Sequence, residues 1–141
     1  MILFTAALLA AAGTLAGQEV RKEHEQLQGN WSFVQAEHDG HKSSPDKLKA
    51  LKLTIGADKL ILRGDKGMEY AYKIDPAKKP KTIDVTPRDG PDKDMVLQGI
   101  YELDGDELKF CFSKPGRDRP TEFVSKENSG LVLIVLKREK P

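Results

Sequence analysis

From residue 30 onwards, hydrophobic and polar residues alternate along the chain with a period of two. Successive side chains of a β-strand point to opposite faces, so this alternation predicts short strands with one buried face. One short helix is predicted over residues 44–50, where Ser44 can cap the helix and Pro45 occupies its first position. The predicted strands are residues 30–37, 51–55, 59–63, 68–74, 82–86, 97–103, 108–112, 121–125 and 131–136.

The segments between the predicted strands are short. Asp104-Gly105 joins two alternating runs directly, which is a strong hairpin signal because both residues tolerate positive φ. Such connections cannot hold crossover helices, so neighbouring strands are expected to pair antiparallel. Eight or nine strands around one core predict an all-β fold, either an antiparallel barrel or a sandwich. The last run, residues 131–136, is apolar on both faces, and its outer face needs a cover from the 44–50 helix or from another subunit.

Residues 1–17 carry no charge and are mostly apolar. The segment is shorter than the ~20 residues that a membrane-spanning helix needs, and small residues follow its core. These features predict a signal peptide over residues 1–17, with a buried N-terminal helix as the alternative. We therefore expect an exported protein, periplasmic or extracellular, with no membrane span once the signal is removed. Residues 18–26 then form a polar N-terminal arm, either a short helix or a loose segment, ahead of one domain over residues 27–138.

Composition narrows the range of partners. The chain has 23 Lys and Arg against 22 Asp and Glu, a formal charge of +1, which gives no electrostatic case for binding nucleic acid or an anionic membrane. Its single cysteine, Cys111, cannot form a disulfide within the chain. The stability of the fold must therefore come from its core.

The motif Gly29-Asn30-Trp31 opens the first predicted strand. A Gly-x-Trp motif at the start of a small antiparallel barrel resembles the lipocalins and the wider calycin group. Further segments narrow this resemblance to an uncharacterised lipocalin-like domain family of planctomycete bacteria. These segments are residues 27–31, 99–106 and 119–123.

The resemblance extends over nearly all of residues 27–138 and implies an eight- to nine-stranded lipocalin-like barrel. It implies that Trp31, in the motif that begins with Gly29, closes the narrow end of the barrel. It also implies that a basic side chain from the end of the last strand, Lys137 or Arg138, packs across the Trp31 ring as a cation–π contact.

The barrel interior is the candidate binding site. Its predicted inward-facing side chains either line a cavity for an apolar molecule or fill the interior themselves, since small eight-stranded barrels do both. Tyr70 and Tyr72 are of special interest because a buried hydroxyl needs a hydrogen-bond partner and can orient a ligand. Beside Trp31, the predicted lining consists of Phe33, Leu53, Ile55, Tyr70, Tyr72, Phe110 and Phe112.

Other polar motifs fit turns better than binding sites. Residues 37–41 hold histidine and acidic side chains, but Asp39-Gly40 is typical of a turn, and no further cysteine or paired histidine completes a metal shell. The acidic turns at residues 89–92 and 104–106 lack the ligand spacing of a calcium loop.

Three further features have an ordinary structural interpretation. The basic run at residues 78–81 has no interleaved aromatics and is expected to be a solvated loop. Cys111 is expected to be a buried, inert thiol. The densest polar cluster, residues 117–122, is expected at a barrel mouth, where it either pairs internally or contacts a partner.

Together these observations predict an exported β-barrel protein that binds a small apolar or amphipathic ligand. No catalysis and no cofactor or metal are expected, because no local signature of nucleophile, base and orienting acid is present. The alternative is a filled barrel that serves as a structural or inhibitor-like interaction module and contacts another protein of the cell envelope.

Overall fold

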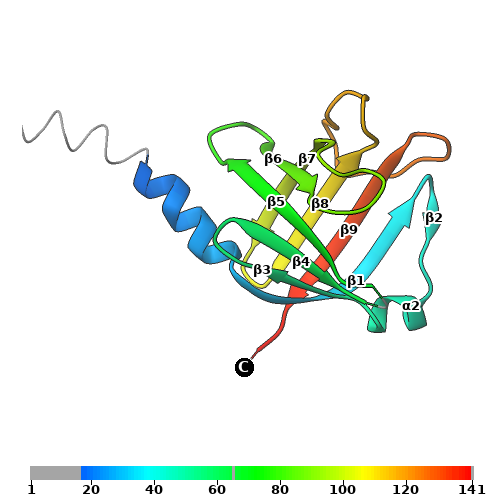
Figure 1. Ribbon diagram of the computed structural model, residues 1–141, viewed down its shortest axis with the longest axis horizontal. Coiled ribbons are helices and arrows are strands. Elements are labelled where there is room, and N and C mark those ends of the chain that lie inside the picture. The colour runs from blue at the N-terminus through cyan, green and yellow to red at the C-terminus, as the bar shows by residue number, and fades with distance from the viewer. Residues whose placement is uncertain (1–16, 65, 141) are drawn as a thin grey trace, which may run out of the picture.

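The structure is a computed structural model that describes residues 17–64 and 66–140 (Figure 1). The predicted signal peptide, apart from Gly17, lies outside the described residues. Within them the chain forms a helix over residues 17–27, a second helix α2 (Pro45–Lys49), and nine strands. The strands are β1 (Gly29–His38), β2 (His41–Lys42), β3 (Lys52–Ile55), β4 (Lys59–Arg63), β5 (Met68–Asp75), β6 (Lys81–Pro87), β7 (Leu97–Asp104), β8 (Glu107–Ser113) and β9 (Leu131–Arg138).

Eight of these strands form one closed antiparallel barrel (Figure 1). From β3 to β9 each strand pairs with the next along the chain, and β1 pairs with β3 on one of its edges. On the other edge β1 pairs with β9, from Trp31 opposite Arg138 to His38 opposite Val132, and this pairing closes the ring. The ninth strand, β2, folds back on the end of β1. Of the two predicted architectures, the barrel is confirmed.

Helix α2 forms where the sequence predicts it. The hydroxyl of Ser44 accepts a hydrogen bond from the Lys47 backbone N–H at 3.4 Å, and Pro45 opens the helix. Leu48 is buried, and the helix packs against β1 on the way back to β3. No helix in the described part of the chain is long and apolar enough to cross a membrane.

One predicted strand is wrong. Residues 121–125 form no strand and belong to the long loop between β8 and β9. An additional strand would need an unpaired strand edge to bond to. β9 already pairs with β8 along its whole length, so no such edge is left there. The loop lies instead over the outer face of the barrel, where the Val124 carbonyl accepts a hydrogen bond from the Cys111 thiol at 3.4 Å. Cys111 and its cross-strand partner Ile100 point outward and are nevertheless buried, so this loop supplies part of the outer cover next to β9.

The last turns of the N-terminal helix cap one end of the barrel, which we call the narrow end, whereas residues 17–22 are exposed and extend away from it (Figure 1). Of the two alternatives for this segment, the chain adopts the helix. Leu27, its last residue, is buried, and its carbonyl accepts the indole N–H of Trp31 at 2.9 Å. Glu23, one turn earlier, accepts a hydrogen bond from the Tyr101 hydroxyl at 3.0 Å. The helix is thus attached to the barrel by specific contacts.

Arg138 connects the last strand to the first at the narrow end. Its guanidinium carbon lies 4.3 Å from the centre of the Trp31 ring, and its terminal nitrogens donate to two backbone carbonyls next to the helix end at 2.5 and 3.1 Å. A Cβ at position 29 would lie 3.3 Å from a guanidinium nitrogen, so Gly29 leaves room for this group. The positive φ of Gly29, 137°, is a second reason for glycine at this position. Of the two basic residues that the sequence offers for Trp31, Arg138 takes the position and Lys137 is exposed.

Replacing Arg138 by Ala should lower the free energy of unfolding by about 2–4 kcal/mol, because the change removes a cation–π contact and charged hydrogen bonds. Lys137→Ala is the matched control and should change it by less than about 0.5 kcal/mol, as expected for an exposed side chain. Urea unfolding followed by the fluorescence of Trp31 measures both. Equal effects of the two substitutions would contradict the role given to Arg138.

Candidate functional site

An apolar cavity of about 260 Å³ lies inside the barrel toward the wide end, opposite the N-terminal helix. Every strand of the eight-stranded ring contributes at least one side chain to its wall. The wall is apolar apart from the hydroxyl of one tyrosine. The lining residues are Phe33, Leu51, Leu53, Leu60, Leu62, Tyr70, Val85, Leu97, Phe110, Phe112, Val132 and Ile134.

The structure brings five of the seven predicted lining side chains to this cavity. Ile55 and Tyr72 belong to the same core but do not line the cavity, and Tyr72 bonds to groups at the narrow end. The other seven lining residues lie outside the predicted set, although they follow the same alternation. Alternation identifies the inward-facing positions, but the register between strands decides which end of the barrel each one reaches. The five are Phe33, Leu53, Tyr70, Phe110 and Phe112.

Two of the three tyrosines have strong partners at the narrow end. Tyr72 donates to the Gly56 carbonyl at 2.7 Å, and Nδ1 of His24 lies 3.1 Å from the same hydroxyl. Because Gly56 takes the hydroxyl proton, the nitrogen of His24 is the donor in that contact. Tyr101 donates to Glu23. Burial raises the pKa of Tyr72 to about 12, and the pKa of Tyr101 is also raised, first by burial and then by Glu23.

The third tyrosine, Tyr70, is the polar group of the cavity. Its hydroxyl lies 3.7 Å from the thioether sulfur of Met68, which is a weak acceptor. Within the described part of the chain this is the one hydrogen bond that the hydroxyl makes. Burial raises the pKa of Tyr70, and the charge of Asp92 raises it further, so the phenol is neutral at pH 7. The cavity therefore offers a ligand a hydroxyl with spare hydrogen-bonding capacity.

Gly99 leaves the space that the ring of Phe112, one of the aromatic side chains of the cavity wall, occupies. It faces inward beside Phe112 of the neighbouring strand, and a Cβ on Gly99 would lie 2.7 Å from Cε1 of the Phe112 ring. A larger residue would have to displace that ring. Phe112 packs in turn against Phe110, with ring centroids 5.4 Å apart.

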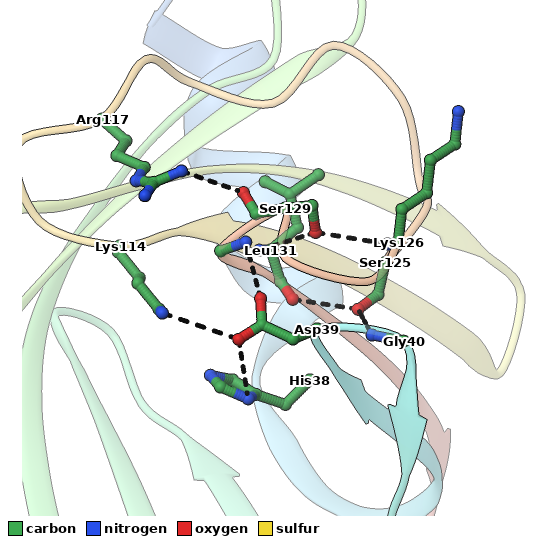
Figure 2. Close-up of polar contacts among 10 residues, drawn as sticks. His38, Asp39, Gly40, Lys114, Arg117, Ser125, Lys126, Ser129 and Leu131 are labelled. Carbon is green, nitrogen blue, oxygen red and sulfur yellow. Dashed lines mark hydrogen bonds and ion pairs between the residues drawn. The ribbon is translucent and has the colours of Figure 1, made fainter.

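Asp39 holds the rim of the wide end together (Figure 2). Asp39 and Gly40 form the turn between β1 and β2 with φ of 50° and 84°, as the sequence predicts for this pair. One carboxylate oxygen of Asp39 accepts the Gly130 N–H at 2.6 Å, and the other lies 3.6 Å from Nζ of Lys114. The backbone N–H of Asp39 donates to the Leu131 carbonyl at 3.2 Å. The β1–β2 hairpin is thereby tied to the end of the β8–β9 loop.

Two further side chains fix the β8–β9 loop. The hydroxyl of Ser125 accepts the N–H of Gly40 at 3.1 Å (Figure 2). The guanidinium of Arg119 donates to backbone carbonyls of β6 and β7 at 3.2 and 2.8 Å and pairs with Asp84 at 2.7 Å. The polar cluster of residues 117–122 thus pairs internally through Arg119, the first of its two predicted alternatives.

The remaining residues with metal-binding or nucleophilic chemistry are dispersed. Over residues 17–64 and 66–140, no three His, Cys, Asp or Glu side chains are grouped so that they could hold a metal ion. Cys111 is fully buried, and burial raises the pKa of its thiol, so the thiolate is disfavoured at neutral pH.

Comparison with protein-family models, with curated proteins and with solved structures gave no match to this chain. The closed barrel is compatible with a lipocalin-like fold. The narrower resemblance to a planctomycete domain family stays a prediction from the sequence.

Acid should loosen the rim through Asp39. Its pKa lies below the ordinary value of 3.8, first because the Gly130 N–H binds the carboxylate and then because of the charges of Lys114 and His38. A carboxyl group whose pKa is lowered by folding stabilises the folded state above its unfolded pKa, and that contribution is lost as the pH falls through the folded pKa. The protection of the Gly130 amide against hydrogen exchange should therefore hold at neutral pH and fall below about pH 4.

Two variants isolate this contact. Asp39→Ala should reduce the Gly130 protection factor at pH 7 by about tenfold, the effect of one lost hydrogen bond to a charged group. Asp39→Asn keeps an oxygen acceptor and tolerates positive φ, so it should retain protection and lose the dependence on pH. The Gly130 amide is followed by NMR hydrogen exchange. Full protection in Asp39→Ala would show that the carboxylate does not hold the rim.

Proposed function

We propose that the protein binds a small apolar or amphipathic molecule in the wide-end cavity without converting it chemically. The observation that carries this proposal is the cavity itself, with about 260 Å³ of space inside apolar walls and one free hydroxyl. Side chains such as Leu62 and Leu97 are only partly buried, which supports entry from this end. Export of the protein, expected from residues 1–17, belongs to the same proposal.

The volume of the cavity limits the size of the buried group. An apolar cavity of about 150 Å³ in a protein core can bind benzene, whereas pockets for drug-sized ligands start near ~300 Å³. A volume of about 260 Å³ lies between these values. It fits a single aromatic ring or a short alkyl chain, with any larger part of the ligand outside the rim.

The chemistry of the walls supports binding without catalysis. Tyr70 is the one titratable side chain among the described residues that line the cavity, and its pKa is raised. General acid–base or nucleophilic catalysis requires several polar groups that converge on one point. An apolar wall with a single hydroxyl favours orientation of a ligand.

The alternative of a filled interaction module is less well supported. A barrel filled by its own side chains leaves no space of this size. Large exposed hydrophobic side chains in the described part of the chain are few, and only Met95 and Val96 are neighbours in sequence. Isolated side chains of this kind are ordinary on a protein surface and do not require a partner.

Toluene is a direct probe of the cavity because it has no polar group. Toluene should cause saturable NMR shifts confined to residues that line the cavity. Leu62→Trp places an indole in this space and should weaken binding at least about tenfold. Val34→Trp adds the same group at a position that is 55% exposed, and it should bind like the unmodified protein. Shifts that do not saturate, or equal binding by both variants, would contradict the proposal.

A further inference from the structure

The β6–β7 connection borders the cavity and is rich in acidic residues. It leads directly into Leu97, which belongs to the cavity wall. Its arginine, Arg88, is paired with Glu69 at 2.9 Å. In contrast, its three exposed aspartates form no ion pair within the described part of the chain. The charged residues of the connection are Arg88, Asp89, Asp92, Lys93 and Asp94.

The field of this connection reaches the free hydroxyl of the cavity. Met68, whose sulfur lies 3.7 Å from the Tyr70 hydroxyl, also lies beside the connection, since a Cβ on Gly90 would be 3.8 Å from Cε of Met68. Tyr70 itself pairs with Pro87, the residue just before the connection. In keeping with this placement, the charge of Asp92 raises the pKa of Tyr70, after the larger effect of burial. A ligand head group held by Tyr70 would feel the same field.

In the β8–β9 loop, Lys114 lies 3.6 Å from Asp39 and Arg117 donates to a carbonyl of its own loop at 3.5 Å. Lys126 of that loop and Lys93 of the connection form no ion pair within the described residues, so the three unpaired aspartates of the connection stand against one unpaired lysine.

We propose that the cavity selects amphiphiles with a neutral or cationic head group, such as alcohols and amines, over carboxylates of equal chain length. The inference rests on the proposed function, because it concerns the same cavity. The apolar walls take the chain, the hydroxyl of Tyr70 hydrogen-bonds to the head group, and the unpaired aspartates of the neighbouring β6–β7 connection disfavour a negative charge there. Exposed charges are screened by solvent, so the expected discrimination is modest.

Three ligands with the same six-carbon chain test the inference. Hexan-1-ol, hexylammonium and hexanoate are titrated at pH 7 and low ionic strength, with binding followed by NMR at the Tyr70 ring. Hexanoate should bind about three- to tenfold more weakly than hexan-1-ol, and hexylammonium at least as tightly as hexan-1-ol. Tyr70→Phe should weaken the binding of hexan-1-ol and leave toluene unaffected, because only the hydrogen bond is removed.

Two charge variants separate the local field from net charge. Asp92→Asn should reduce the gap in affinity between hexanoate and hexan-1-ol, whereas Asp104→Asn, at the exposed end of β7, should leave the gap unchanged. If hexanoate binds as tightly as hexylammonium, or if both variants act alike, the head-group inference is wrong while binding in the cavity stands. If hexan-1-ol, hexylammonium and toluene all fail to bind, the proposed function itself fails.

Discussion

The pairing of β1 with β9 is the interaction on which the rest of this structure depends. It joins the first and last strands of the domain, leaves no open edge in the ring, and places Arg138 across the ring of Trp31. Trp31 and Arg138 both donate hydrogen bonds to carbonyls in the last turn of the N-terminal helix. The residues that close the ring therefore also hold the helix against the narrow end. No helix among residues 17–64 and 66–140 covers the wide end in this way, and the cavity lies toward that end.

The tyrosine hydroxyls at the two ends of the barrel differ in their hydrogen-bond partners. At the narrow end the hydroxyls of Tyr72 and Tyr101 are bound to a carbonyl and to a carboxylate, so this end is internally satisfied. Toward the wide end Tyr70 has only a sulfur partner within the described residues, amid apolar walls. The Tyr70 side chain is only partly buried, so its hydroxyl stays accessible to the polar group of a ligand. The cavity thus combines a shape for an apolar group with a single point of polar contact.

Much of the fold could be predicted because alternation, hairpin turns and helix caps are local properties of the sequence. The ring strands, the Asp104-Gly105 hairpin and α2 follow from such signals. The strand predicted at residues 121–125 does not form, because β9 already pairs with the edge of β8 to which it would have to bond. The site was predicted only in part for a related reason: alternation places Tyr70 and Tyr72 on the same inward face, and only the long-range register separates the free hydroxyl from the bonded one.

The barrel is filled at the capped end and has an apolar cavity toward the other. Crystals held under xenon gas test it most directly, because xenon enters dry apolar space and adds no hydrogen bonds. We expect a xenon atom among Phe33, Tyr70 and Phe112, and none between Trp31 and the N-terminal helix. An interior without xenon, in which the lining side chains meet one another across the barrel, would contradict it.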